Sequence, residues 1–430
     1  MAKVLVVGAG GREHAIVRAL ARSPQVEAPG DLHAAPGNPG IAEDATVHDV
    51  AVDDVPGLVG LARELGVDLV AVGPEVPLVA GLVDALQEAS IPAFGPTAAA
   101  ARLEGSKAFA KEVMIAAGVP TAGHETVTSV DAGMEVATSF GFPVVLKYDG
   151  LAAGKGVVIA QDENEARATL VDMLEDQRFG DAAVVVEEFL DGEELSLLAV
   201  CDGERAVALA PAQDYKRIFD GDEGPNTGGM GSYSPVVGID AERAAQISAD
   251  VHQPIVEELA RRGTPFRGVL YAGLMLTAEG VKVLEYNTRF GDPETQAVLP
   301  RLRSDLLELM QASAGVDGAT LDDVTLAWDP RWAVTLVLAS AGYPASASKG
   351  DRITGVERAA EREAVEVTHA GTARDADGDL LTAGGRVLNV TALGDAPVDA
   401  RAEAYAAADG IGFDGRQLRR DIALRAVERY

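Results

Sequence analysis

The first 95 residues alternate between short apolar runs and amphipathic helical patterns, and this alternation limits the fold more than any other feature. "KVLVVGAG" predicts a buried strand and "REHAIVRALARS" an amphipathic helix, and "VPGLVGLARELG" followed by "VDLVAVGPE" adds a helix and a strand. Strands that alternate with helices form a parallel sheet with right-handed crossovers, whose carboxyl ends border a binding crevice. We therefore expect an N-terminal parallel α/β substrate-binding domain over residues 1–105. Its crevice loops are Gly8–Arg12, Ala35–Gly40 and Gly73–Pro77.

The remaining sequence has a different organisation. After the helix pattern "SKAFAKEVMIAAG", the strand patterns "FPVVLKYDG", "KGVVIA" and "AVVVEEFL" predict a small α+β flap subdomain at about residues 121–190. The flap belongs to a central domain over residues 106–322, which continues with antiparallel strand patterns. A composition shift near "GATLDDVTLAWDPRW" begins a C-terminal mixed α/β domain over residues 323–430. A chain of 430 residues, 47% of them apolar, is long enough for these separate cores.

The charge balance narrows the possible partners and compartment. The chain has 36 basic and 67 acidic residues, and this net charge of −31 repels nucleic-acid backbones. We find no apolar run near the roughly 18 residues of a membrane span and no signal-peptide pattern. A single cysteine, Cys201, is typical of a reducing cytoplasm. Acid excess with scarce lysine predicts a halophilic enzyme; an ordinary acidic enzyme from a GC-rich genome is the alternative.

The glycine-rich stretch "KYDGLAAGKGVVIA" is not a P-loop. That motif needs four residues between its glycines and a Ser/Thr after its lysine, before a helix. Here three residues separate Gly150 from Gly154, Gly156 follows Lys155, and "VVIA" predicts a strand. We interpret the stretch as a β-turn-β flap that closes over phosphates, with Lys147 and Lys155 reaching them. A mobile hairpin is the alternative.

The N-terminal "GAGGREHA" resembles a dinucleotide fingerprint but lacks its third glycine, because Glu13 stands in the sixth position. Gly8, Gly10 and Gly11 still permit a tight turn whose amides face an anion at a helix N-terminus. A phosphate on a small substrate suits this turn better than a pyrophosphate. A plain βα turn is the alternative.

The stretch "VLEYNTRFGDPE" predicts a metal site. In a strand, Glu285 and Asn287 point to the same face, with their oxygen atoms ~7 Å apart, within reach of one hard cation. Arg289 adds a positive charge beside them. Such a polar face is costly to bury without ligands, and a divalent ion with nucleotide phosphates supplies them. An exposed strand face is the alternative.

Two further stretches carry candidate residues. In "VVVEEFLDGEELS", the strand-end acids Glu187 and Glu188 and the later Glu194 have the pattern of a nucleoside site, although an acidic surface turn fits equally well. In "QDYKRIFDGDEGPNTGGMGSYSP", Asp214 and Lys216 precede a long glycine-rich loop, and loops of this length inside a domain are usually functional.

Taken together, these motifs resemble the phosphoribosylamine–glycine ligases (glycinamide ribonucleotide synthetases), a family of ATP-grasp enzymes of purine synthesis. The matching segments run along the whole chain: "VGAGGREHA", "PGN", "GPEVPLVAG", "FGPTAAAARLEGSKAFAK", "KYDGLAAGKGVVIA", "VEEFLDGEELS", "QDYKRIFDGDEGPNTGGMGSYSP", "LEYNTRFGDPETQAVLPRL", "SAGYP" and "HAGTA". Pro39, Tyr148 and Tyr215 depart from the family pattern. These departures affect fine contacts and leave the charged positions in place.

The resemblance implies an α/β and α+β multidomain fold, with a pre-ATP-grasp N-terminal domain, a two-part ATP-grasp domain and a small C-terminal mixed β domain. It also implies the reaction. The glycine carboxylate attacks the γ-phosphate of ATP, and the amine of 5-phosphoribosylamine attacks the resulting glycyl phosphate. Such phosphoryl transfer depends on positioning and charge neutralisation.

The resemblance assigns residues to each ligand. ATP is held by Lys107, Lys147, Lys155, Gly156, Glu187, Glu188, Phe189, Leu190 and Glu194. The other substrate contacts are Gly10, Gly11, Asn38, Glu75, Lys216, Asp292 and Lys349. Arg289 and Asp214 are catalytic at the glycine end, and Glu285 and Asn287 bind Mg²⁺ or Mn²⁺. We expect a cytoplasmic monomer, with a dimer as the alternative.

Three other functions remain open from the sequence. Another ATP-grasp ligase of purine metabolism would use a different acid or amine. A nicotinamide-dependent oxidoreductase would use "GAGGREHA", and a nucleotide sensor would bind ATP without turnover. The missing third glycine and the unexplained Glu285–Arg289 cluster oppose the oxidoreductase.

Overall fold

Parallel strands form the N-terminal sheet of the computed structural model, which describes residues 1–152 and 156–430. The strand order is β3-β2-β1-β4-β5, and successive strands are added on one side of β1 and then on the other. The binding crevice of such a parallel sheet lies at the carboxyl ends of β1 and β4, where the order switches sides. The strands are β1 Val4–Gly8, β2 Leu32–Pro36, β3 Thr46–Val47, β4 Leu69–Val72 and β5 Ala93–Phe94. The helices between them are α1 Gly11–Ala21, α2 Ile41–Asp44, α3 Val55–Leu65, α4 Glu75–Val79 and α5 Leu82–Glu88.

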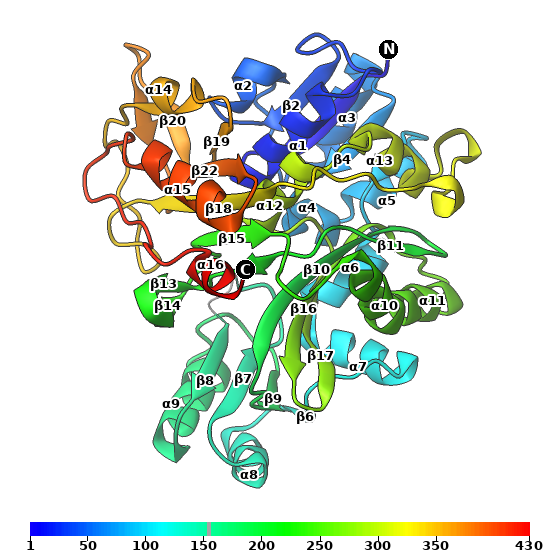
Figure 1. Ribbon diagram of the computed structural model, residues 1–430. Coiled ribbons are helices and arrows are strands. Elements are labelled where there is room, and N and C mark those ends of the chain that lie inside the picture. Colours follow the sequence, from blue (N-terminus) through cyan, green and yellow to red (C-terminus); the bar gives the residue numbers. More distant parts are fainter. Residues whose placement is uncertain (153–155) are drawn as a thin grey trace.

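Two helices, α6 Ala98–Gly105 and α7 Lys107–Ala117, lead into the flap. The flap sheet has the order β6-β9-β7-β8 and carries two helices on one face. Its elements are β6 His124–Val127, α8 Val130–Phe140, β7 Val144–Tyr148, β8 Val157–Ala160, α9 Glu163–Leu174 and β9 Val184–Glu188. The flap has its own apolar core and projects away from the other domains (Figure 1).

The central sheet is antiparallel, with the order β11-β10-β16-β17. Its strands are β10 Glu193–Asp202, β11 Ala206–Ala208, β16 Arg267–Thr277 and β17 Gly280–Asn287. The helices of this part are α10 Ala241–Val251, α11 Gln253–Arg261, α12 Glu294–Val298 and α13 Leu306–Ala314. One face of the sheet packs with α13 against the N-terminal domain, and its other face contributes to the core that includes the C-terminal domain.

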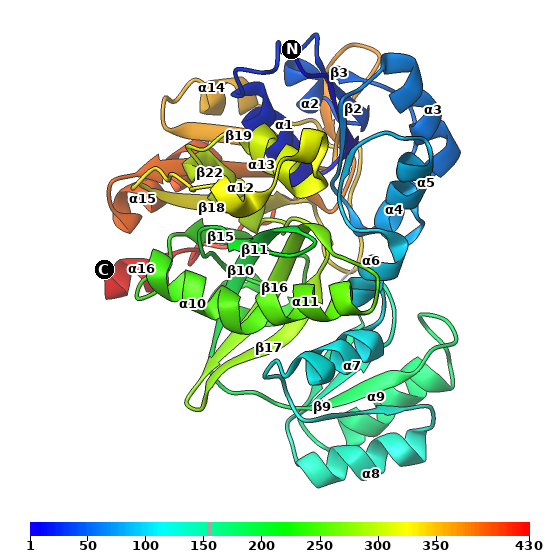
Figure 2. The same ribbon diagram turned by 90° about the vertical axis from the view of Figure 1, so that its right-hand side faces the viewer.

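A second antiparallel sheet, β12-β15-β18-β22-β19, lies beside the N-terminal domain (Figures 1 and 2). Its strands are β12 Gln213–Asp214, β15 Gly231–Ser234, β18 Trp332–Ala339, β19 Val365–His369 and β22 Arg386–Gly394. The hairpins are β13 Arg217–Phe219 with β14 Glu223–Asn226, and β20 Thr372–Arg374 with β21 Leu380–Thr382. The helices are α14 Val356–Ala360, α15 Pro397–Ala408 and α16 Leu424–Arg429. The strands β12 and β15 come from the expected central domain but belong to the sheet of the C-terminal domain. The segment around them therefore joins these two domains.

No helix among the described residues is long and apolar enough to cross a membrane.

The N-terminal sheet meets the central sheet at two glycines. A Cβ atom on Gly268, in β16, would lie 2.9 Å from the Cα of Gly95, which follows β5. Gly268 also has a φ of +105°, which side-chain-bearing residues rarely adopt. The close approach of these two backbones therefore requires glycine.

We expect Gly268→Ala to lower the free energy of unfolding by about 1–3 kcal/mol more than Gly280→Ala, because only the first change overpacks an interface. Gly280 is a matched control, since it has a φ of +129° and nothing within 4 Å of an added Cβ. Urea unfolding followed by tryptophan fluorescence measures both variants. Equal losses would show that the glycine contact does not constrain the interface.

Candidate active site

Strand β17 carries the predicted metal ligands on one face. Tyr286 points the other way, and its hydroxyl donates a hydrogen bond to the Val251 carbonyl. A β-bulge adds Leu284 to the strand, because Glu285 pairs with Gly273 while Val283 pairs with Leu274. The Leu284 carbonyl accepts a hydrogen bond from Lys147 Nζ at 2.9 Å, which joins β17 to the flap strand β7.

Glu285 is a partly buried carboxylate among cationic side chains. Burial opposes its ionisation, but the charges of Lys216, Lys147 and Lys107 outweigh burial and hold its pKa below the usual range. Ionised carboxylate and amide oxygens are hard ligands suited to Mg²⁺ or Mn²⁺. Among residues 1–152 and 156–430, no cluster of three or more His, Cys, Asp or Glu side chains forms a metal site.

Glu187 lies between two lysines. Its Oε2 accepts a hydrogen bond from Lys111 Nζ at 2.8 Å, and Lys147 Nζ lies 3.0 Å from its Oε1. Burial opposes ionisation of Glu187, yet the two ammonium groups hold its pKa low. Glu187 thus orients Lys147, and its carboxylate is occupied within the protein. Sequence reasoning assigned Lys111 no role, although its spacing of four residues from Lys107 places both on one helix face.

The glycine-rich stretch is anchored at its beginning. Asp149 Oδ1 accepts hydrogen bonds from Ser106 Oγ (2.9 Å) and the Ala108 amide (3.1 Å), and Lys107 Nζ donates to the Gly150 carbonyl at 3.0 Å. At the other end, the Gly156 carbonyl accepts a hydrogen bond from the Tyr148 amide. The start of the flap turn therefore lies against the N-terminus of α7. The predicted phosphate ligand Lys155 lies outside the described residues.

The residues after β9 form the joint between the flap and the central sheet. Glu188 Oε1 accepts a hydrogen bond from the Gly123 amide at 2.9 Å. Leu190 is buried against Ala122 and Met275, whereas Phe189 is exposed.

A second acidic cluster lies beside Lys216. Lys216 Nζ lies 2.9 Å from Glu194 Oε2, and Ser196 Oγ lies 3.4 Å from Asp214 Oδ1 and 3.3 Å from Glu294 Oε1. The Tyr271 hydroxyl also donates to Glu294, at 3.2 Å. Burial raises the pKa of Asp214 to about 7, with Glu294 adding to the shift and Lys216 opposing it.

This cluster includes residues that sequence reasoning did not select. Ser196, Tyr271 and Glu294 come from β10, β16 and α12, which are far apart in the chain. The only signal was Glu294 itself, which ends the "GDPE" segment beside the metal motif.

Arg289 is held by carboxylates of the N-terminal part. Its Nε lies 3.3 Å from Glu75 Oε2, its Nη2 lies 3.0 Å from Glu104 Oε1, and Nη2 also donates to Asn287 Oδ1 at 3.1 Å. Glu104 Oε2 accepts a second hydrogen bond from the Thr288 amide at 2.7 Å. The predicted residues Glu75, Asn287 and Arg289 therefore meet, and Glu104, which was not predicted, positions the guanidinium.

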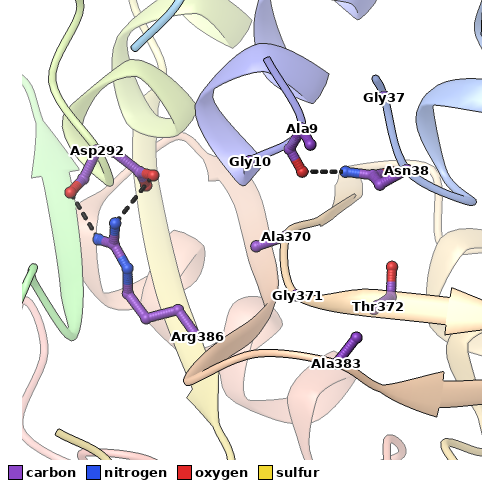
Figure 3. A pocket seen from close by; sticks show the side chains of 10 residues that line it. All are labelled: Ala9, Gly10, Gly37, Asn38, Asp292, Ala370, Gly371, Thr372, Ala383 and Arg386. Carbon is purple, nitrogen blue, oxygen red and sulfur yellow. Dashed lines mark hydrogen bonds and ion pairs between the residues drawn. The ribbon is translucent and has the colours of Figure 1, made fainter. Parts of the chain in front are cut away.

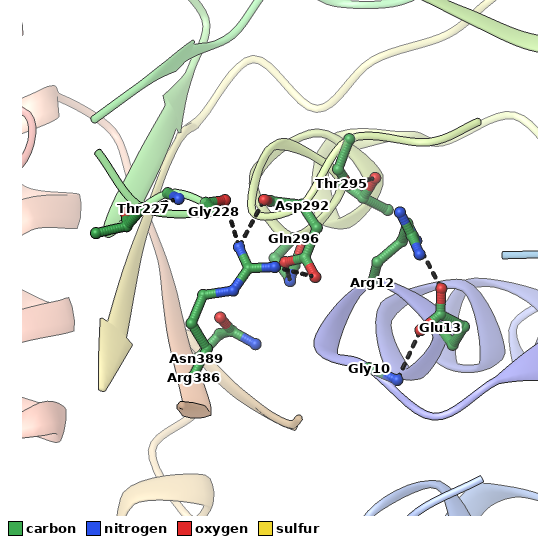
Figure 4. Close-up of polar contacts among 12 residues, drawn as sticks. Gly10, Arg12, Glu13, Thr227, Gly228, Asp292, Thr295, Gln296, Arg386 and Asn389 are labelled. Atoms are coloured by element: carbon green, nitrogen blue, oxygen red, sulfur yellow. Dashed lines mark hydrogen bonds and ion pairs between the residues drawn. The ribbon is translucent and has the colours of Figure 1, made fainter. Parts of the chain in front are cut away.

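A cavity of about 410 Å³ opens where the three domains meet (Figure 3). It is lined by Ala9, Gly10, Gly37, Asn38, Asp292, Ala370, Gly371, Thr372, Ala383 and Arg386. Arg386 donates hydrogen bonds to the Gly228 and Asp292 carbonyls and to Asp292 Oδ2 (Figure 4). The cavity thus has one guanidinium and one carboxylate on the same wall. Lys349 is exposed and does not line it.

The predicted residues of the N-terminal crevice are engaged within the protein. The Gly10 amide donates to Glu13 Oε2 at 2.6 Å, so the side chain of Glu13 satisfies the amide at the start of α1 (Figure 4). The Glu13 carboxylate therefore engages one amide of this turn, and the phosphate contact of Gly10 and Gly11 stays a prediction. The Asn38 amide group donates to Ala9 and His369 carbonyls and accepts two backbone hydrogen bonds, so it holds the cavity wall. Gly11 is buried, and a Cβ there would meet Asn389 Nδ2.

The raised pKa of Asp214 predicts a pH effect on stability. The folded-state pKa lies above the unfolded value of about 3.9, so the folded protein binds the extra proton and stability falls as the pH rises from about 4 to 7. We expect Asp214→Asn to be more stable, relative to wild type, at pH 8 than at pH 5. Urea unfolding at both pH values tests this, with the exposed Asp191→Asn as control. An unchanged pH dependence in Asp214→Asn would contradict the assignment.

Comparisons with known proteins agree with this architecture. The family models for phosphoribosylglycinamide synthetase match in three parts: the N domain over residues 2–104, the ATP-grasp (A) domain over 105–295 and the C domain over 333–425. The phosphoribosylamine–glycine ligase of Streptomyces coelicolor is 52% identical over 99% of both chains.

Solved structures show the same fold. The phosphoribosylamine–glycine ligase of Thermotoga maritima has a TM-score of 0.83 at 35% identity, covering 98% of this chain and 100% of that one. A biotin carboxylase from Campylobacter jejuni, at 14% identity, shares only the fold, with a TM-score of 0.73 over 100% of this chain and 95% of that one. The multidomain ATP-grasp fold predicted from the sequence is confirmed. Matches that span nearly the full length at this identity show that the chain belongs to the phosphoribosylglycinamide synthetase family.

Proposed function

We propose that this chain ligates glycine to 5-phosphoribosylamine with ATP, giving glycinamide ribonucleotide, ADP and phosphate. The observation that carries the proposal is the convergence of Lys107, Lys147, Lys216 and Arg289 around the ionised Glu285. Lys147, Lys216 and Arg289 are each held by carboxylates of the protein, and a triphosphate would be a further anion for the cationic groups that meet here. Family membership and the cavity beside this cluster support the same reaction.

In this proposal the ATP phosphates lie against Lys107 and Lys147, and the adenine borders the segment that ends at Leu190. Glu285 and Asn287 hold a divalent ion, Mg²⁺ or Mn²⁺, whose chemistry is to neutralise charge on the phosphates during transfer. Asn287 Oδ1 has a free lone pair for this, because an amide oxygen accepts two bonds and Arg289 uses one. The residue Lys155 remains a proposed phosphate ligand.

Glycine fits between the acidic cluster and Arg289. Asp214 and Glu294 complement its ammonium group, with Ser196 and Tyr271 orienting their carboxylates. Arg289, fixed by Glu75 and Glu104, complements its carboxylate. An oxygen of that carboxylate attacks the γ-phosphorus, the bond to the β-phosphate oxygen breaks, and ADP leaves. Closure of the flap excludes water, which would hydrolyse the acyl phosphate.

The cavity of Figure 3 is the proposed phosphoribosylamine site. Arg386 complements the sugar phosphate, in place of the exposed Lys349, and Asp292 faces the polar sugar. Asp292 and Glu294 are two residues apart, so the cavity adjoins the glycine cluster. The amine then attacks the acyl carbon and loses a proton, and the acyl–phosphate bond breaks.

The other predictions from the sequence stand as part of this proposal. They are the domain boundaries 1–105, 106–322 and 323–430, the flap at about 121–190, a cytoplasmic location, the halophilic character and the monomer, with a dimer as alternative.

The function is tested by ADP release at high KCl. We expect release only when glycine and freshly made phosphoribosylamine are both present, or a slow leak with glycine alone. Replacement of either substrate by another acid or amine separates the reaction from that of other ATP-grasp ligases. ADP release that does not depend on glycine would contradict the proposal.

Arg289→Ala should lower kcat/KM roughly a hundredfold or more. This corresponds to a loss of at least about 3 kcal/mol of transition-state stabilisation, the scale on which one preorganised electrostatic contact contributes. Steady-state kinetics measure the loss, and thermal melting separates it from unfolding. Arg243→Ala is the control, since Arg243 lies on an exposed face of α10 and bonds only locally to Gln246. Activity of Arg289→Ala within threefold of wild type would reject the role.

A further inference from the structure

Arg419 is the largest fully buried side chain in the described part of the protein, although it lies only eleven residues from the end of the chain. A buried guanidinium is costly unless its donors are paired. Its Nε and Nη2 donate to the two carboxylate oxygens of Asp421, at 2.8 and 2.6 Å. This bidentate pair compensates the charge and leaves Nη1 to bond elsewhere.

The remaining bonds of Arg419 reach a segment two hundred residues earlier. Its Nη1 donates to the Arg217 carbonyl at 3.1 Å and to Asp222 Oδ1 at 2.9 Å. The guanidinium also lies over the Tyr215 ring, 4.8 Å from its centroid. Arg419 therefore contacts the first residue of β13 and the residue that precedes β14. It also contacts Tyr215, which lies between Asp214 and Lys216.

Residues close to Arg419 in the chain also bond to the segment around Tyr215 and β13. We call residues 419–429 the C-terminal clamp. The Ala423 amide donates to the Tyr215 hydroxyl at 3.0 Å. Asp421 Oδ2 accepts from the Gly221 amide at 2.9 Å, and the Arg420 amide donates to Asp220 Oδ1 at 2.7 Å. At the end of α16, Arg429 pairs with Glu193 at 2.6 Å, beside Glu194.

The segment that the clamp holds has little secondary structure of its own. Strand β12 contains only Gln213 and Asp214 and pairs with β15 alone among the described strands. Lys216 follows two residues later, outside the strand. Backbone hydrogen bonds to Thr227, Met230 and Gly231 hold Tyr215 and Lys216, and the clamp adds contacts through the Tyr215 side chain and the Arg217 carbonyl.

We propose that Arg419 is a positioning residue for the amino-acid substrate. It acts through Tyr215 and the Arg217 carbonyl, and it orients Asp214 and Lys216 without touching the substrate. This role rests on the proposed function, in which Asp214 complements the glycine ammonium group. The phosphoribosylamine cavity is lined by other residues, so its affinity should not depend on Arg419.

The test compares Arg419→Met with Arg416→Met, a control in the same segment whose guanidinium bonds to the Ala408 and Ile411 carbonyls within the C-terminal domain. We expect Arg419→Met to raise KM for glycine at least tenfold while KM for phosphoribosylamine stays within twofold. Arg419→Lys should recover part of the loss. Arg416→Met should leave the glycine KM within twofold. A folded Arg419→Met enzyme with an unchanged glycine KM, or with equal rises for both substrates, overturns the proposal.

A second variant and a second measurement keep the outcomes distinct. If Arg419→Met does not fold, Asp222→Ala removes one acceptor of Arg419 at a half-exposed position, and a threefold or greater rise in glycine KM is expected. Hydrogen exchange of the amides over residues 217–226 measures the clamp without turnover. Exchange that is no faster in Arg419→Met than in wild type overturns the clamp, even if wild type shows no glycine-dependent ADP release and the proposed function fails.

Discussion

The site depends on a partly buried carboxylate, Glu285, whose negative charge is stabilised by the cations around it. Lys107, Lys147 and Lys216 approach Glu285 from α7, from the flap strand β7 and from the segment after β12, and their charges hold its pKa below the usual range despite burial. Removal of water strengthens each of these attractions, so the charges constrain how the three elements are placed. A triphosphate that binds the same lysines would be repelled by Glu285. A divalent ion between them resolves this conflict, which is the physical reason to expect one.

The other carboxylates extend the same principle to the domain contacts. Glu75 and Glu104 bring the N-terminal part to Arg289, and Glu187 binds both Lys111 and Lys147. In each pair the carboxylate fixes the position of a cationic side chain at the site. That carboxylate is then engaged within the protein. The flap, by contrast, keeps a separate apolar core and meets the central sheet through a small cluster. The flap is therefore linked to the rest of the site mainly by polar contacts, among them those of Lys147 and Glu187.

Local patterns predicted the elements and the most regular part of the site. The alternation of residues 3–95 predicted a parallel sheet, and the period of two in β17 placed Glu285 and Asn287 on one face. The missing third glycine of "GAGGREHA" argued against a dinucleotide site, but it did not reveal what occupies the turn. Glu13 does more than replace a glycine: side chains at Gly8, Gly10 or Gly73 would collide with it, so it fills the turn. The available signal was an acidic residue in the first turn of the helix, where a carboxylate interacts favourably with backbone amides.

By itself, the sequence determined which segments become strands and helices, the family, and the residues of β17 and its approaches, because these follow from spacing within short windows. Only the tertiary structure decided the partners of those residues. Glu104, Ser196, Tyr271, Glu294, Arg386 and Arg419 reach the site from elements distant in the chain, and several of them act through groups that they hold in place. Their roles come from the balance between burial and charge, which exists only after the domains have packed together.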